Sequence, residues 1–170
     1  NMKAVICEKF GPIEDLKYKD VPDPAAGFGQ VLVNIKAAGV NFPEALMVQG
    51  QYQVKPNHPF IPGSEFSGIV SALGEGVENF KVGDRVIGIS PDFGAFAEKI
   101  AVDASCLIPT PDGMPHRVAA NILLAHGTAY HGLKQRGQLQ VRETLVVLGA
   151  AGGTGLAAVQ IGKAMGARVI

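Results

Sequence analysis

From Met2 to about Pro109 the chain shows short runs of apolar residues, several of them alternating with polar ones, and each run ends at residues that favour turns. Such runs are typical of β-strands, and FGP, PDPAAGFG, GEGV, VGDR and PDG provide the turns. Many short strands at this spacing predict a barrel or a sandwich. The predicted strands are Lys3–Cys7, Leu16–Asp20, Gln30–Ala38, Glu65–Leu73, Asp84–Gly88, Gly94–Val102 and Cys106–Ile108.

One short helix is predicted inside this β-rich part, in FPEALMVQG, where Pro43 suits a first helical turn. After TPDGMP the apolar residues recur at helical spacing, which predicts two helices that meet near Gly127. The last segment, ETLVVLGAAGGTGLAAVQIGKAMGARVI, predicts a five-residue apolar strand, a glycine turn, a helix and the start of a second strand. This is a β-α-β unit with parallel strands. We place a domain boundary near residue 120, between 1–120 and 121–170.

Two parallel strands and one helix cannot cover both faces of a sheet, and parallel sheets are normally covered on both. We therefore expect 121–170 to be the incomplete start of a larger domain, and the chain to be the front part of a longer protein.

Composition narrows the classes of function. Apolar residues make up 47% and charged residues 18% of the chain, and 15 basic residues balance 15 acidic ones. This balance argues against nucleic acid or a membrane surface as a partner. No apolar run is long enough for a membrane span, and the N-terminal residues do not resemble a signal peptide. We expect a cytoplasmic protein. Two distant cysteines and four scattered histidines predict neither a disulfide framework nor a structural zinc site.

The glycine turn is the clearest chemical motif. Within VVLGAAGGTGLAAVQ, Ala150, Gly152 and Gly155 match a dinucleotide fingerprint with alanine at its first position. We expect the N–H groups of Gly152, Gly153 and Thr154 to face a pyrophosphate at the positive end of the helix. The alternative is a tight structural turn. The residue that distinguishes NAD from NADP is expected about 20 positions after the glycines, beyond Ile170.

Taken together, several segments resemble the medium-chain dehydrogenase/reductase superfamily: MKAV, GQVLVNIKAAGVNF, PGSEFSGIVSALGEGV, KVGDRVIG, GAFAEKIAV, GTAYHGL and GAAGGTGLAAVQIGKAMGARVI. The resemblance implies a GroES-like β-barrel, followed by the first β-α-β unit of a doubly wound Rossmann domain that is truncated here, with the active site between the two domains. It also implies a homodimer for the full-length protein.

The zinc-dependent alcohol dehydrogenases of this superfamily have a cysteine where this chain has Asn41, and a histidine where it has Ser64. The resemblance therefore implies the zinc-independent branch, which includes quinone oxidoreductases, zeta-crystallin-like proteins and reductases of enones and enoyl thioesters. It predicts no metal site, NADPH as cofactor with NAD as an alternative, and a small-molecule quinone or enone as substrate. Reduction of such acceptors needs no Lewis acid, because hydrogen-bond donors can stabilise the enolate or quinol anion.

Three further assignments follow from the resemblance, and each has an alternative. Tyr52 is expected to be catalytic as a hydrogen-bond donor or proton relay, or else to close a loop. Asn41 is expected to face the nicotinamide or the substrate, and it also suits the cap of the helix that begins at Phe42 or Pro43. Thr128 is expected beside the nicotinamide, or else bonded within its own helix. Glu65 is expected to be structural.

Two other classes of function compete with this one. A nucleotide-binding sensor or structural protein would bind NADPH with negligible turnover. A serine hydrolase that uses Ser64 and His58 is disfavoured, because Gly63-Ser64-Glu65-Phe66-Ser67 lacks the Gly-x-Ser-x-Gly elbow.

Overall fold

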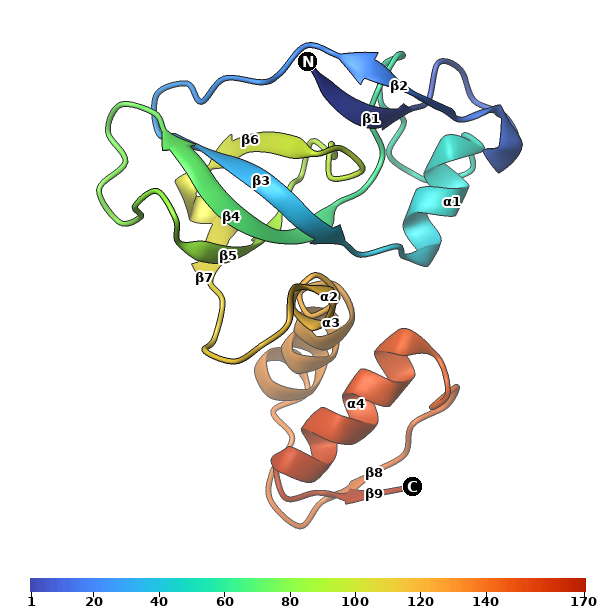
Figure 1. The fold of residues 1–170 in the computed structure, drawn as a ribbon. Helices are drawn as coiled ribbons and strands as arrows, with labels where there is room; N and C mark the ends of the chain where they lie inside the picture. The colour runs from blue at the N-terminus through green and yellow to red at the C-terminus, as the bar shows by residue number, and fades with distance from the viewer. The chain divides into compact units, whose positions relative to one another are not determined.

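The computed structural model describes residues 1–170, which form two compact units, Asn1–Asn121 and Ile122–Ile170. Figure 1 shows strands throughout the first unit, and helices with one short pair of strands in the second. The first unit contains β1 (Met2–Ile6), η1 (Ile13–Asp15), β2 (Lys17–Val21), β3 (Gln30–Ala38), α1 (Phe42–Val48), β4 (Glu65–Leu73), β5 (Arg85–Ile89), β6 (Lys99–Asp103), η2 (Ala104–Cys106), β7 (Leu107–Pro109) and α2 (His116–Ala119).

A five-stranded antiparallel sheet, in the order β6-β3-β4-β5-β7, forms the centre of the first unit. Val31 and Val33 of β3 and Phe66 of β4 lie fully buried in its core. Gly88 of β5 pairs with Phe66 across the sheet. A Cβ at Gly88 would lie 2.3 Å from the Phe66 ring, so this aromatic side chain fits only against a glycine. Two register shifts between β3 and β4 bend the sheet.

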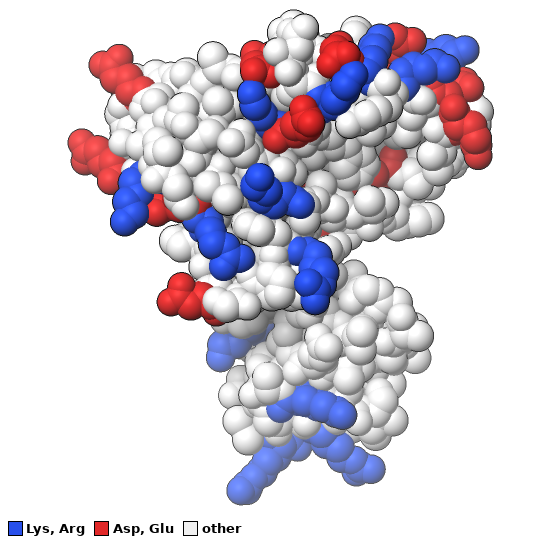
Figure 2. Space-filling model, viewed as in Figure 1, with Lys and Arg blue, Asp and Glu red and all other residues white.

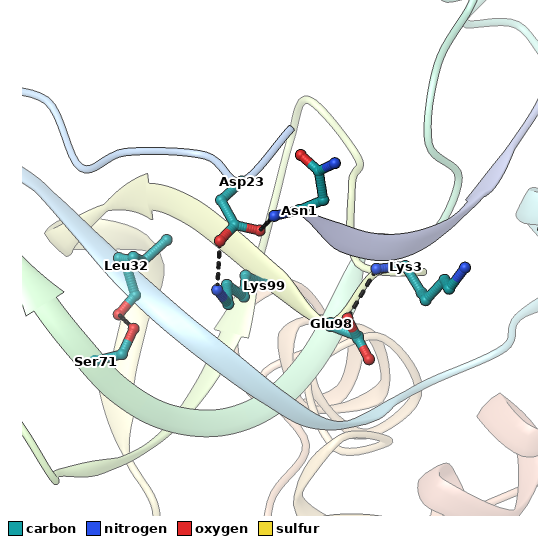
Figure 3. A network of polar contacts seen from close by, with 7 residues as sticks. All are labelled: Asn1, Lys3, Asp23, Leu32, Ser71, Glu98 and Lys99. Atoms are coloured by element: carbon teal, nitrogen blue, oxygen red, sulfur yellow. Dashed lines mark hydrogen bonds and ion pairs between the residues drawn. The ribbon is translucent and has the colours of Figure 1, made fainter. Parts of the chain in front are cut away.

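The strands β1 and β2 form a separate antiparallel pair that is attached to the rest of the unit mainly through the backbone. An isolated bridge joins Ala4 to Ala97. Figure 3 shows Asp23 paired with Lys99 at 2.7 Å and with the terminal amine of Asn1 at 3.6 Å. These ion pairs are partly exposed and therefore contribute little to stability. The backbone hydrogen bonds fix the pair in place.

The strand β4 also buries polar side chains. Glu65 and Ser67 alternate with Phe66 along β4, so they point to the opposite face, and both are fully inaccessible to solvent. The helix α2 packs against β3 and β4, and its last residue, Ala119, and the following Ala120 are fully buried. A buried polar side chain is costly unless it is hydrogen-bonded, so this face of β4 requires partners.

Ser67 finds these partners in a chain of hydrogen bonds. Its hydroxyl donates to the carbonyl of Val86 at 3.0 Å and also contacts Nδ1 of His116 at 2.8 Å. Because the only hydroxyl hydrogen is directed at Val86, Nδ1 of His116 must be the donor to Ser67. Burial lowers the pKa of His116, and the nearby cations Arg85 and Lys36 lower it further. His116 is therefore a neutral Nδ1–H imidazole at neutral pH, and it attaches α2 to the sheet.

The second unit contains α3 (Ala125–Tyr130), η3 (His131–Arg136), β8 (Thr144–Leu145), α4 (Gly153–Ala164) and β9 (Arg168–Val169). β8 and β9 are parallel, with α4 as the connection between them, as predicted for a β-α-β unit. Gly162 of α4 allows close packing, since a Cβ there would lie 2.6 Å from the Leu145 side chain. None of the helices has the length and apolar character needed to cross a bilayer.

One predicted strand of the first unit is wrong in extent, whereas the others lie within one residue of the observed strands. The sequence predicts a strand over Gly94–Val102, but β6 covers Lys99–Asp103. The backbone N–H groups of 94–96 bond instead to the carbonyls of 61–63. Residues 94–96 are therefore hydrogen-bonded to 61–63, but not in the regular pattern of a β-strand.

The five-residue apolar strand predicted before the glycine turn is also too long, since β8 comprises only Thr144 and Leu145. The N–H of Val147 also donates to the carbonyl of Ile170 at 2.9 Å, so the hydrogen bonding of this run extends beyond Leu145.

The prediction of two helices that meet near Gly127 is wrong, because Gly127 lies inside α3. The break lies earlier, between α2 and α3, where the Asn121 side chain donates to the carbonyl of Arg117 at 2.9 Å. Asparagine side chains compete with helical hydrogen bonds in this way, which favours a helix end at this position.

The partly buried His116 predicts a pH dependence of stability. Because its pKa is lower in the folded than in the unfolded protein, unfolding takes up a proton, and the free energy of unfolding falls as the pH drops below about 6.5. When the pH is lowered from about 7.5 to about 5.5, we expect the free energy of unfolding to fall more in the unsubstituted protein than in His116→Asn. The Asn side chain cannot titrate in this range, but it still offers an N–H to Ser67. Urea unfolding measures the free energy of unfolding of both proteins at both pH values. His131→Asn, at an exposed position, is the control. An equal loss of unfolding free energy in the unsubstituted protein and in His116→Asn would refute the role of His116 in this pH dependence.

Candidate functional site

Asn41 lies between the end of β3 and the start of α1, where it is the N-cap residue. Its backbone N–H donates to Oε2 of Glu44 at 2.9 Å, which is one half of a capping box. Its side-chain Nδ2 donates to Oε1 of Glu65 at 2.8 Å. Asn41 is therefore held from both its backbone and its side chain, and the capping role expected from the sequence coexists with a contact to β4.

Ser64 joins the same cluster from the residue before β4. Its hydroxyl donates to Oε1 of Glu44 at 3.0 Å. The carboxylate of Glu44 thus accepts from both Asn41 and Ser64, which brings the two positions together although they are 23 residues apart in the chain. Glu44 is 3% exposed and Glu65 is fully buried, whereas Asn41 and Ser64 are partly exposed. The amide and the hydroxyl form the accessible surface, and the two carboxylates lie beneath them.

Metal binding by this cluster would need a further ligand. The structure brings together no group of three or more His, Cys, Asp or Glu side chains that could hold a metal ion. What the cluster offers is a set of directed hydrogen-bonding groups.

The helix α1 positions Tyr52 through its C-terminal end. Gly50 has a φ of +69°, and its N–H donates to the carbonyl of Met47 at 3.0 Å. The N–H of Gln51 donates to the carbonyl of Leu46 at 2.8 Å, which completes a Schellman motif. Tyr52 follows this motif directly and is partly exposed, and its hydroxyl makes no hydrogen bond within the chain. The hydroxyl is therefore available to a ligand.

In the second unit the glycine turn precedes α4 and is largely exposed. Gly149 has a φ of +70°, which favours glycine, and Gly152 is the N-cap residue of α4. A Cβ at Gly155 would lie 2.2 Å from the carbonyl oxygen of Gly149. Only glycine at position 155 lets the first turn of the helix approach the preceding loop so closely.

One detail of the predicted phosphate cradle is wrong. The N–H of Gly152 does not face outward, because it donates to the carbonyl of Gly149 at 3.0 Å. The N–H groups of Gly153 and Thr154 belong to the first turn of α4, where no helical carbonyl precedes them. The donors available to an anion therefore start one residue later than predicted. Ala150 lies in the exposed turn beside them.

The charges of the second unit suit an anionic ligand. Figure 2 shows acidic and basic side chains mixed over the first unit, but basic ones over the visible face of the second. The second unit contains one acidic residue, Glu143, which precedes β8 and accepts from the N–H of Gln140 at 2.7 Å. The glycine turn lies after β8, so no carboxylate of the turn would repel phosphate. The basic residues of this unit are Lys134, Arg136, Arg142, Lys163 and Arg168.

The remaining predicted site residue, Thr128, lies on α3 and is exposed. Its N–H makes the ordinary helical bond to the carbonyl of Leu124 at 3.1 Å, and its hydroxyl makes no bond to its own helix. Asn41 and Tyr52 thus belong to the first unit, and Thr128 and the glycine turn to the second.

Glu44 is a site residue that the sequence pattern did not identify, because FPEALMV was predicted only as a short helix. The sequence does contain a signal for Glu44, because Asn41 and Glu44 have the spacing of a capping box. The spacing predicts the bond to the Asn41 backbone. It does not predict the bond to Ser64, which depends on how β4 packs beside α1.

Comparison with known proteins identifies the family. Residues 27–112 match the alcohol dehydrogenase GroES-like domain, which covers the central sheet, α1 and the cluster of Asn41, Glu44, Ser64 and Glu65. The chain belongs to this family. It is a member of the medium-chain dehydrogenase/reductase superfamily, and the predicted fold class, a GroES-like domain followed by the start of a Rossmann domain, is confirmed.

Full-length relatives of this GroES-like family member include several reductases. A quinone oxidoreductase-like protein 2 homolog of Nematostella vectensis is 37% identical over 99% of this chain and 46% of its own length. An acryloyl-coenzyme A reductase of Sulfurisphaera tokodaii is 31% identical over 99% of the chain and 58% of its own length. The quinone oxidoreductase of Thermus thermophilus, solved also with NADPH, is 37% identical with a TM-score of 0.85 over 99% of this chain and 52% of that one. The chain spans about half the length of the relatives it matches.

The contact between Gly155 and Gly149 predicts a position-specific effect of alanine. Gly155→Ala places a methyl group against the Gly149 carbonyl and should lower the free energy of unfolding by roughly 1–3 kcal/mol. Gly153→Ala is the matched control, since no atom lies within 4 Å of a Cβ there, and it should be neutral or slightly stabilising. Thermal unfolding compares the two variants. Equal melting temperatures would show that the turn does not require the close approach.

Proposed function

We propose that the full-length protein carrying this chain is an NADPH-dependent reductase of quinones or conjugated carbonyl compounds that works without zinc. The observation that carries the proposal is the pairing of Asn41 and Ser64. They occupy positions where zinc-dependent members of the superfamily have a cysteine and a histidine, and here both are hydrogen-bonded to buried carboxylates. Relatives named quinone oxidoreductase and acryloyl-coenzyme A reductase support the class of reaction.

The glycine turn supports the choice of a dinucleotide. Gly149, Gly152 and Gly155 leave room for backbone to approach a pyrophosphate, and the N–H groups of Gly153 and Thr154 would donate to it at the positive end of α4. Ala150 would lie beside the phosphates and Thr128 beside the nicotinamide. The NADPH complex of the Thermus thermophilus relative supports NADPH. When bound, NADPH supplies a hydride.

The residues of the chain then act on the charge that develops in the acceptor. Reduction of a quinone or an enone places negative charge on an oxygen, and a directed hydrogen-bond donor stabilises this charge without a metal. Tyr52 is the proposed donor, since its hydroxyl is partly exposed and makes no bond within the chain. It would donate the hydrogen bond and then a proton. Asn41 and Ser64 would orient the bound molecules through hydrogen bonds.

The proposal predicts that the full-length protein oxidises NADPH in the presence of quinones or conjugated enones. Tyr52→Phe removes the proposed donor and should lower kcat roughly 100-fold while NADPH binding stays intact. Absorbance at the NADPH band measures turnover across a panel of acceptors, and fluorescence titration measures binding.

Tyr18→Phe is the control, because Tyr18 lies 70% exposed on β2 and should be replaceable without effect. Tight NADPH binding without turnover on any acceptor would favour a sensor or structural role and contradict the proposal. Equal kcat values in the protein and in Tyr52→Phe would remove Tyr52 from the mechanism.

A further inference from the structure

The direction of the Ser64 hydroxyl hydrogen is determined by Glu44. A carboxylate can only accept hydrogen bonds, and Oε1 of Glu44 accepts from Ser64 at 3.0 Å. Ser64 has a single hydroxyl hydrogen, which this bond uses. The lone pairs of Ser64 Oγ therefore remain for a ligand, and the partly exposed side chain can accept a hydrogen bond but cannot donate one.

The second oxygen of Glu44 fixes the position of the neighbouring group. Oε2 accepts from the backbone N–H of Asn41 at 2.9 Å, so the same carboxylate holds both residues at a set distance. Glu65 accepts from Nδ2 of Asn41 at 2.8 Å, which turns the amide nitrogen toward β4. The carbonyl oxygen of the Asn41 side chain thus faces away from Glu65. This oxygen has two lone pairs, so it remains an acceptor even where it also caps the first turn of α1.

This polarity limits which molecule Ser64 can bind. Quinones and enones have carbonyl oxygens, which are acceptors, so the Ser64 hydroxyl offers them no hydrogen bond. The nicotinamide end of NADPH has donors in its carboxamide N–H₂ and its ribose hydroxyls. A donor group of this kind is the complement of the Ser64 hydroxyl oxygen and of the Asn41 side-chain carbonyl oxygen.

We propose that Glu44 is a positioning residue, which holds Ser64 and Asn41 as hydrogen-bond acceptors for the donors at the nicotinamide end of NADPH. The inference rests on the proposed function and adds a role for a buried carboxylate within it. Glu44 itself is 3% exposed and acts through Ser64 and Asn41.

Glu44→Gln tests the proposal, because its amide can donate to Ser64 and thereby turn the hydroxyl hydrogen outward. We expect KM for NADPH to rise about 5- to 10-fold in the full-length protein, the loss of roughly one hydrogen bond, with little change in KM for the acceptor. Ser64→Ala should raise KM for NADPH by a similar factor. In the double variant the two effects should not multiply, because both act through the same hydroxyl.

The controls separate positioning from stability. Glu14→Gln, on the exposed η1, should leave both KM values unchanged. Melting temperatures establish that each variant is folded. If Glu44→Gln does not fold, Ser64→Ala and Ser64→Thr replace it. Threonine keeps the hydroxyl and should keep KM for NADPH, whereas an unchanged KM in Ser64→Ala would overturn the proposal.

The remaining outcomes are also decisive. Multiplying effects in the double variant, an unchanged KM for NADPH in Glu44→Gln, or an effect confined to KM for the acceptor would each overturn the role of Glu44 while leaving the proposed function intact. A protein that oxidises no NADPH with any acceptor would overturn the proposed function and this inference together.

Discussion

Two carboxylates, Glu44 and Glu65, are buried where the end of β3, the start of α1 and the start of β4 meet. Burying a carboxylate is costly unless donors surround it, so the backbone and side chains nearby are arranged to supply them. Asn41 donates to both carboxylates, and Ser64 donates to Glu44. The proposed catalytic surface of the first unit follows from this requirement.

In the second unit, the structure of the glycine turn depends on a close approach between two parts of the backbone. The turn before α4 is compact because Gly155 has no Cβ to meet the Gly149 carbonyl. The helix therefore starts directly after the turn, with N–H groups in its first residues that no carbonyl of the helix satisfies. In the second unit, the absence of a Cβ at Gly155 leaves room for the backbone. In the first unit, the buried carboxylates of Glu44 and Glu65 fix the direction of the hydrogen-bond donors.

Much of this fold could be predicted from local patterns. The strands of the central sheet lie within about one residue of the prediction, apart from β6, because alternating burial and turn residues are local properties. The break between α2 and α3 could not be predicted from Gly127, because it lies before this glycine, next to the side-chain bond of Asn121.

The candidate site was predictable only in part, because local patterns do not show the contacts between distant parts of the chain. Motifs identified Asn41, Ser64 and the glycine turn, and in this turn Gly155 lets the helix approach the Gly149 carbonyl closely. The outward direction expected for the Gly152 N–H was wrong, because a bond to Gly149 takes that donor. The contact between Glu44 and Ser64 joins residues 20 positions apart, and no local pattern predicts such a bond.

The most direct test of this account is the zinc content of the active full-length protein. Elemental analysis of a preparation with full NADPH-dependent turnover should find far less than one zinc per chain, because the proposed role of Asn41 and Ser64, which are hydrogen-bonded to carboxylates, is hydrogen bonding and not metal binding. Dialysis against a chelator should leave kcat unchanged. One zinc per chain, lost on dialysis together with turnover and restored by added zinc, would contradict the account.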